Sequence, residues 1–423
     1  MFYIPRSCKI AGALLLVLLF CVMLIKQRNL HLYPVQNYFP INKQALPLPR
    51  TGGHDTPGLS DGNSETTNST ESTRTKQHIV FIKVHKAAST TMHNILTRFA
   101  LSNNLNIMLN SQKQHINELG YRINKDTLVP KPCGSTFDIL CNHLIYNHSE
   151  ISQYFPNDTV YIGIVREPFS QFLSAFVYYS YIYPNVVNRK VIEANPENPI
   201  EEFLYKTDVY LKGNPPNYIF LDNRMSVDFG FPLHNFQQSK SNESIISDFI
   251  KSLDKTIDFV LIVEYFDESL ILLRRIMNWS TKDIIYIQNN VQKPNDNWLP
   301  FVNRKKYPPF VKSKFQNFAR LDIRVYKHFL ELFHRKLQEQ PPDFQYEVDA
   351  FRIIRKNVTE LCSVLLAGEN QAKEVTVPGT EFTTRFSLSM RDCVLLTDSE
   401  IKITNKAKAE QLNRANDHTC SLQ

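Results

Sequence analysis

The sequence predicts an α/β fold in which a parallel sheet is flanked by helices. Three passages support this prediction, because each joins an apolar, β-rich run to a stretch whose apolar residues recur at helical spacing. The β-rich runs are residues 78–84, 160–165 and 258–266. Strands that alternate with amphipathic helices favour a parallel sheet covered on both faces, so we expect one α/β domain built around these strands.

The helices have signals of their own. Apolar residues within 92–99 and within 169–177 fall on one helical face, and Pro168 suits the first turn of the second helix. After the third run, Asp267 suits the N-cap position. A further helix is expected over roughly residues 315–336, packed outside the sheet.

One transmembrane helix is expected before the domain, at Ile10–Ile25, an uncharged run with basic residues on both sides. Flanking lysines and arginines help a short span reach both surfaces, and no small-residue cleavage site follows, so an uncleaved signal anchor is favoured over a signal peptide. Residues 1–9 would form a cytoplasmic tail, and residues 26–77, rich in turn formers, a flexible lumenal stem. The globular domain is expected over 78–362, with a polar, irregular C-terminal extension over 363–423.

The sequons and the cysteines indicate which cellular compartment holds the body of the protein. Six N-x-[ST] sequons without proline fit a lumenal body and therefore type II topology. They begin at Asn68, Asn147, Asn157, Asn242, Asn278 and Asn357. Five cysteines follow the anchor, so in an oxidising lumen at least one is free or pairs between chains. Cys133 and Cys141 are the nearest pair and could close a small loop.

Composition excludes several classes of protein. A hydrophobic content of 43% with 21% charged residues is that of a globular chain rather than a disordered one. The formal charge of +7 suits an anionic ligand, but no segment has the dense basic stripe expected for nucleic acid. No C-x-x-C or H-E-x-x-H spacing occurs, so no metal is expected.

Chemistry is predicted at KVHKAASTT, residues 83–91, which directly follow the first strand. Ligands of open α/β sheets bind where helix N-termini present unpaired N–H groups beyond the strands. The amides of Ala87–Thr90 could surround a phosphate, with the Ser89 and Thr90 hydroxyls as donors and Lys86 as counter-charge. The alternative is a helix capped by Ser89 beside solvated lysines. A Walker loop does not fit, because its glycines are absent and the lysine comes first.

The loop resembles a known pattern. A lysine, small residues and then Ser-Thr after the first strand form the 5′-phosphosulfate loop of sulfotransferases that use 3′-phosphoadenosine 5′-phosphosulfate (PAPS). The second half of that pattern, an arginine at a strand end and a serine eight residues later, is matched by Arg166 and Ser174. Arg166 could instead pair with Glu167 or another acid, and Ser174 could simply fill its helix.

Longer segments narrow the resemblance. From about His78 to Lys336 the chain resembles the galactose 3-O-sulfotransferase family, of the galactosylceramide sulfotransferase type. The segments that carry this resemblance are FIKVHKAASTTMHNIL, CNHLIYNHS, IVREPFSQFLSAFVYYS, NRMSVDFGF, DFVLIVEYFDESLILLRRIMNW and LDIRVYKHFLELFHRKL. One departure is that Ala87 and Ala88 stand where the family often has threonine and then alanine or glycine. The hydroxyl lost at position 87 could weaken one phosphate contact.

The resemblance implies a PAPS-dependent sulfotransferase fold over 78–362 and a function. A sulfonate group would pass from PAPS to the 3-hydroxyl of a terminal β-galactose on a glycolipid or a glycoprotein glycan. The enzyme would lie in the Golgi membrane, single-pass type II, with its catalytic domain in the lumen, and a homodimer is left open. The alternatives are a different sugar acceptor, such as a uronic acid or N-acetylgalactosamine, or a catalytically silent Golgi glycan-binding protein.

Roles for residues follow from the same resemblance. Lys86 would stabilise charge on the leaving bridging oxygen. The other donor-binding residues would be Lys83, Ala87, Ala88, Ser89 and Thr90 in the loop, with Arg166 and Ser174 on the 3′-phosphate. His143 is the first choice for a general base, because related sulfotransferases carry a histidine base between the two donor motifs, and His85 is the second. Tyrosines within 176–183 offer an aromatic face to the sugar.

Overall fold

The computed structural model describes residues 74–117, 120, 122–182, 186–214, 220–287, 307–368 and 373–417. The expected cytoplasmic tail, the signal anchor at Ile10–Ile25, the stem up to residue 73 and the sequon at Asn68 lie outside these ranges. Within them, no helix combines the length and the apolar character needed to cross a membrane.

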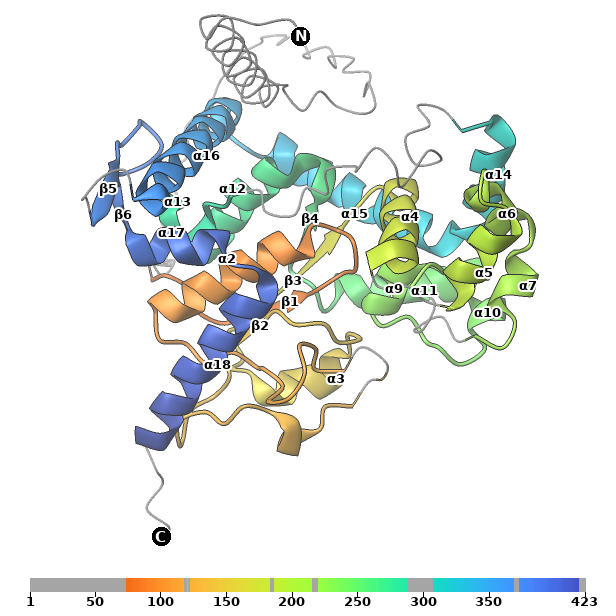
Figure 1. Cartoon of the computed structure of the whole chain (residues 1–423), viewed down its shortest axis with the longest axis horizontal. Helices are drawn as coiled ribbons and strands as arrows, with labels where there is room; N and C mark the ends of the chain where they lie inside the picture. The colour runs from red at the N-terminus through yellow and green to blue at the C-terminus, as the bar shows by residue number, and fades with distance from the viewer. Residues whose placement is uncertain are drawn as a thin grey trace, which may run out of the picture. The chain divides into compact units, whose positions relative to one another are not determined.

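Four parallel strands form the central sheet, in the order β2–β1–β3–β4 (Figure 1). They are β1 (Ile79–Ile82), β2 (Ile139–Leu140), β3 (Val160–Val165) and β4 (Phe259–Ile262), and all their residues are buried. Strands without an exposed residue are typical of a parallel sheet covered on both faces. The predicted α/β class, with a parallel sheet flanked by helices, is confirmed.

Each predicted strand-to-helix passage is present. α2 (Ser89–Ser102) follows β1, α4 (Pro168–Val177) follows β3, and α12 (Phe266–Met277) follows β4. The apolar residues of α2 within 92–99 are buried, as their spacing predicts, and Pro168 occupies the first turn of α4. The first two passages therefore place two helix N-termini just beyond adjacent strands.

The strand predicted from the third apolar run, residues 258–266, is β4, and it is shorter than that run. β4 ends at Ile262, and Val263–Tyr265 forms a 3₁₀ turn before α12. Tyr265 holds the N-cap position, so the predicted cap at Asp267 is wrong. Asp267 lies in the first turn of α12, where the helix dipole favours a carboxylate, and accepts a hydrogen bond from Tyr286 Oη at 2.8 Å.

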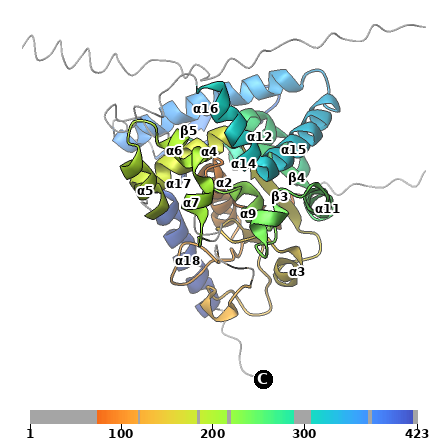
Figure 2. The same cartoon turned by 90° about the vertical axis from the view of Figure 1, so that its right-hand side faces the viewer.

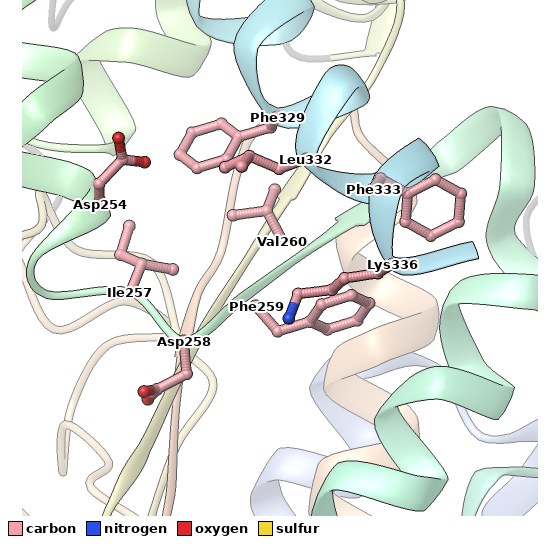
Figure 3. A pocket seen from close by; sticks show the side chains of 9 residues that line it. All are labelled: Asp254, Ile257, Asp258, Phe259, Val260, Phe329, Leu332, Phe333 and Lys336. Carbon is pink, nitrogen blue, oxygen red and sulfur yellow. The ribbon is translucent and has the colours of Figure 1, made fainter. Parts of the chain in front are cut away.

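The helix predicted over roughly 315–336 is two helices, α14 (Pro309–Phe318) and α15 (Arg320–Gln338), which meet at Ala319. The break lets them pack on different cores: Phe318 joins an aromatic cluster around α4, while Phe329 and Phe333 join the core of the sheet. Figure 3 shows side chains of α15 and of the start of β4 around a hollow. The volume of this hollow is about 260 Å³. This hollow lies at the amino end of β4, opposite the edge predicted to bind a ligand.

Shorter helices connect these elements, and Figures 1 and 2 show α5, α6 and α7 gathered beside α4 and α14. A π-helical turn, Tyr178–Ile182, directly follows α4. The connecting helices are α3 (His148–Ile151), α5 (Val186–Ala194), α6 (Pro199–Tyr205), α7 (Thr207–Leu211), α9 (Arg224–Asp228), α10 (Phe236–Ser239), α11 (Glu243–Asp254) and α13 (Thr281–Ile284), with 3₁₀ turns at Lys125–Thr127 and Ser152–Tyr154.

The described residues after Cys362, 363–368 and 373–417, form helices and strands, contrary to the expectation of an irregular extension. The elements of this part of the chain are α16 (Phe344–Ala367), which carries Cys362, the antiparallel pair β5 (Glu374–Val377) and β6 (Phe386–Ser389), α17 (Met390–Thr397) and α18 (Glu400–Asp417). Both α17 and α18 contact α2 (Figure 1). Ile403 and Ala407 of α18 are buried. The C-terminal extension therefore completes the core beside the first strand-to-helix passage.

The predicted loop between Cys133 and Cys141 is wrong. Cys141 is a free, fully buried thiol beside Thr97 of α2, whereas Cys133 is exposed and belongs to another disulfide bond. The two residues thus lie in different environments. A disulfide joins Cys362 to Cys393 instead. The free thiol of Cys141 agrees with the expectation that at least one cysteine is free or pairs between chains.

The sequons of the described residues all lie at the surface. Asn157, Asn242 and Asn278 are exposed, and Asn147 and Asn357 are partly exposed. Asn147 and Asn242 also cap the helices that follow them, so their side-chain oxygens accept hydrogen bonds from backbone N–H groups. Their glycosylation remains a prediction, compatible with this exposure.

The disulfide between Cys362 and Cys393 is expected to stabilise the fold, because it closes a segment with a sequence separation of 31. Replacing both cysteines with serine should lower the free energy of unfolding by about 3 to 4 kcal/mol, measured by denaturant titration. Thr376→Ser, an exposed change in the adjacent β5, is the control. An unchanged denaturation midpoint in the double variant would contradict this role.

Candidate active site

The two predicted halves of the site meet at the carboxyl edge of the sheet. β1 and β3 are neighbours in parallel register, with Ile82 opposite Gly163, so the chain leaves both strands at the same edge. Arg166 directly follows β3, and its Nη1 donates a hydrogen bond to the backbone carbonyl of Lys86 at 3.1 Å. The arginine and the lysine loop are therefore in direct contact.

The loop after β1 has an unusual backbone. Lys86 (φ 60°) and Ala88 (φ 52°) are left-handed, although neither is glycine. Alternating left- and right-handed residues turn successive N–H groups toward one point and form an anion-binding concavity. Ala88 is the N-cap of α2 and has no side-chain acceptor, so the alternative in which Ser89 caps the helix is wrong. The conformation, at a helix N-terminus, suits a phosphate or sulfate.

The side chain of Lys86, the first left-handed residue of the loop, is partly buried. Its Nζ lies 4.0 Å from the centre of the Tyr178 ring, in the π-helical turn after α4. Burial, with a smaller contribution from the charge of Arg166, lowers the pKa of Lys86 to about 8. The positive charges of Lys86 and Arg166 repel each other in this partly buried place, and a bound anion would stabilise both.

Ser174 lies on the side of α4 that faces the loop. Gln171, three residues earlier, donates from Nε2 to the carbonyl of His85 at 2.9 Å, and Tyr178, four residues later, contacts Lys86. Residues three and four apart share a helical face, so Ser174 lies between two side chains that touch the loop. The carboxylate of Glu167 caps α4 by accepting from the N–H groups of Phe169 and Ser170, rather than serving only as a partner for Arg166.

Lys83 and Thr90 are turned toward the C-terminal helix. Lys83 is 1% exposed, and its Nζ forms an ion pair with Glu400 at the start of α18. Thr90 Oγ1 donates to the other oxygen of the same carboxylate at 2.9 Å. Neither side chain is therefore directed into the loop concavity in this structure, and the geometry does not support the expected contacts of Lys83 and the Thr90 hydroxyl with a donor. The side chains of Ala87 and Ser89 are buried, so these residues can serve the predicted site only through the backbone N–H groups of the loop.

The two candidate bases lie against each other. The rings of His85 and His143 stack with their centres 3.8 Å apart. His143 Nδ1 lies 3.0 Å from the carbonyl oxygen of Lys83, which can only accept, so Nδ1 carries the proton and Nε2 the lone pair. Burial, followed by the charges of His85, Lys83 and Arg224, holds the pKa of His143 well below its usual range. His143 is therefore neutral near pH 7.

His85 is fixed by a carboxylate that sequence reasoning did not identify. Asp228 of α9 accepts from the backbone N–H of His85 at 2.8 Å and lies 2.9 Å from its Nδ1. Burial by itself raises the pKa of Asp228, but Arg224 and His85 outweigh it, and the net pKa is lowered. Arg224 and Asp228 form an ion pair one helical turn apart. A signal was present in NRMSVDFGF, where Arg224 and Asp228 are opposite charges at i, i+4 spacing among several apolar residues.

Aromatic side chains border the histidines. Phe220 lies beside His85, with ring centres 5.1 Å apart, and Tyr179 stacks on Phe220 at 4.5 Å. Of the tyrosines predicted to face a sugar, Tyr178 contacts Lys86 of the loop directly. Tyr179 reaches the loop through Phe220, which contacts His85. Together the lysine, the arginine, the neutral histidine and the left-handed loop can hold a multiply charged anion beside a group able to accept a proton.

Comparison with known proteins places the sequence in a family. The sequence model of the galactose-3-O-sulfotransferase family matches residues 6–378. Human galactose-3-O-sulfotransferase 2 is 29% identical over 289 residues, which is 67% of this chain and 68% of that protein. Human galactose-3-O-sulfotransferase 3 is 30% identical over 61% of this chain and 56% of its own length. Human galactosylceramide sulfotransferase is 27% identical over 68% of this chain and 64% of its own length.

The match covers most of the sequence, including the loop, the arginine and the histidine pair. The resemblance noted from sequence motifs is thereby confirmed. The chain is an enzyme of the galactose-3-O-sulfotransferase family.

Proposed function

We propose that this enzyme transfers a sulfonate group from PAPS to the 3-hydroxyl of a terminal β-galactose. The observation that carries the proposal is the hydrogen bond from Arg166 to the Lys86 carbonyl, because it brings the two halves of the predicted donor site into contact. The family membership supports the reaction class. When bound, PAPS supplies the activated sulfonate group.

The donor would be held at both of its charged ends. The N–H groups of Ala87, Ala88, Ser89 and Thr90 surround the 5′-phosphate, and the left-handed residues of the loop support this role. Arg166 and Ser174 hold the 3′-phosphate from the start of α4 and from its loop-facing side. Lys86 neutralises charge on the bridging oxygen, and sulfonate transfer resembles phosphoryl transfer in depending mainly on positioning and electrostatics.

We propose His143 as the general base. Its neutral ring and unprotonated Nε2 suit proton abstraction from a sugar hydroxyl. His143 is partly exposed, whereas His85 is 5% exposed, so an acceptor reaches His143 more readily. His85, held by Asp228, then supports the ring of His143 by stacking.

The acceptor is a β-galactose carried by a glycolipid of the galactosylceramide type or by a glycoprotein glycan. Human galactosylceramide sulfotransferase and human galactose-3-O-sulfotransferase 2 match this chain to a similar degree, so identity does not rank the two acceptor classes. A Golgi lumenal location, with a type II anchor at Ile10–Ile25, is part of the proposal. The disulfide between Cys362 and Cys393 and the exposed sequons support an oxidising, glycosylating compartment.

Binding of adenosine 3′,5′-bisphosphate tests the donor site without knowledge of the acceptor. At a hundred times its Kd this product should stabilise the purified protein by about 2.7 kcal/mol, seen as a rise in Tm. Arg166→Ala should lose most of that rise, because about 2 kcal/mol of charged hydrogen bonding disappears. A folded wild-type protein without any Tm shift would refute the proposal.

Transfer from labelled PAPS to a panel of acceptors then tests the second substrate. Galactosylceramide and a β-galactose-terminated N-glycan should be sulfated at the 3-hydroxyl. The acceptor sulfated at the higher rate identifies the natural acceptor class, glycolipid or glycoprotein. Labelling only of a uronic acid or of N-acetylgalactosamine would identify a different sulfotransferase. Bisphosphate binding without transfer to any sugar would contradict the proposed reaction but not the donor site.

Lys86→Ala should reduce kcat by roughly a hundredfold to a thousandfold while the fold is retained, because charge on the leaving oxygen loses its partner. The variant's kcat is compared with that of Lys125→Ala, an exposed lysine on a 3₁₀ turn that should retain wild-type activity. Equal turnover in the wild type and Lys86→Ala would remove Lys86 from the mechanism.

The pH dependence of kcat/KM for PAPS should show an alkaline limb near the Lys86 pKa of about 8. Lys86 is charged below that pH and loses its proton above it, so activity falls as pH rises. The acid limb should lie well below pH 6.5, because the pKa of His143 is lowered. In Lys86→Arg the alkaline limb should disappear, since guanidinium remains charged. An unchanged limb in that variant would assign it to another group.

A further inference from the structure

One carboxylate touches both ends of the donor loop. Glu400, the first residue of α18, pairs with Lys83 through one oxygen, and its other oxygen accepts from Thr90 Oγ1 at 2.9 Å. Lys83 directly follows β1, and Thr90 lies in the first turn of α2. The two contacts therefore bracket the segment 83–90, which contains the left-handed residues.

The contact is charged and buried. The side chain of Lys83 has no exposed surface, and that of Glu400 is 24% exposed. Burial by itself raises the pKa of Glu400, but Lys83, His93 and the hydrogen bond from Thr90 lower it to about 2, so the carboxylate is ionised. A buried ammonium group that loses its partner becomes strongly unfavourable, and Lys83 depends on this carboxylate.

The loop needs support of this kind. Lys86 and Ala88 are left-handed without being glycine, and such conformations persist only where surrounding contacts determine them. From the side of α4, Gln171 and Arg166 bind the carbonyls of the loop centre. The ends of the loop are held by Glu400, which binds Lys83 and Thr90.

We propose that Glu400 is a positioning residue that holds the segment 83–90 in its anion-binding conformation. For its effect on the donor, the inference rests on the proposed function of the loop. Glu400 lies beyond residue 378, where the match to the family ends, so this clamp is contributed by the C-terminal extension.

The test compares full-length Glu400→Gln and Glu400→Asp with the wild type. Glu400→Gln removes the charge that Lys83 requires. Glu400→Asp keeps the charge but is too short to reach both ends of the loop, and it preserves the buried charge balance if Glu400→Gln fails to fold. Glu410→Gln is the matched control, because Glu410 of the same helix pairs with Arg391 at the surface.

Two measurements are made on each variant. Amide hydrogen exchange of residues 83–90 without donor reports the loop itself, and steady-state kinetics report KM for PAPS and kcat. Glu400→Gln should accelerate exchange in the loop and raise KM about tenfold, with kcat at saturating PAPS nearly unchanged, because a disordered loop binds the donor less well. Glu400→Asp should raise KM by about threefold, and Glu410→Gln should match the wild type.

Wild-type exchange and wild-type KM in the folded Glu400 variants would overturn the proposal. A fall in kcat with unchanged KM would also overturn it, since the carboxylate would then act elsewhere than through donor binding. Failure of the proposed function has a different signature, because the wild type itself would then neither bind adenosine 3′,5′-bisphosphate nor use PAPS. The exchange comparison would still decide whether Glu400 holds the loop.

Discussion

The parallel pairing of β1 with β3 is the constraint on which the site depends. It brings the chain out of both strands at one edge of the sheet, so that Arg166 reaches the backbone of Lys86. A shift of one residue would turn the side chains of a strand to the other face and separate these groups. Both strands are fully buried, as expected of parallel strands covered on both faces, and the observed register sets Ile82 opposite Gly163.

The loop between β1 and α2 is held by neighbours rather than by its own sequence. Without glycine, the left-handed backbone at Lys86 and Ala88 is unfavourable in isolation. Contacts from α4, α9 and α18 converge on it, and Asp228 binds the backbone of His85 while Arg166 binds the carbonyl of Lys86. The loop thus resembles a preorganised binding surface, in which the rest of the fold maintains a conformation suited to an anion.

Local patterns predicted three of the four sheet strands and the helices that follow them, because periodicity needs no distant information. The meeting of Lys86 with Arg166 was implied by the resemblance to a family pattern, and the short β2 was not predicted. Local patterns could not predict the direction of Lys83, whose partner Glu400 lies 317 positions away. Asp228 is 143 positions from His85, and no local pattern joins the two. The separate packing of α14 and α15 likewise depends on two cores that form only in the folded chain.

The C-terminal extension has a consequence for recombinant production. A fragment that stops at residue 378, where family similarity ends, would retain β5 without its partner strand and would present an open edge to other chains. It would also leave Cys362 as an unpaired thiol and uncover the face of α2 that α17 and α18 shield from water. Such a fragment invites aggregation and mispaired cysteines, so an expression boundary belongs beyond residue 417.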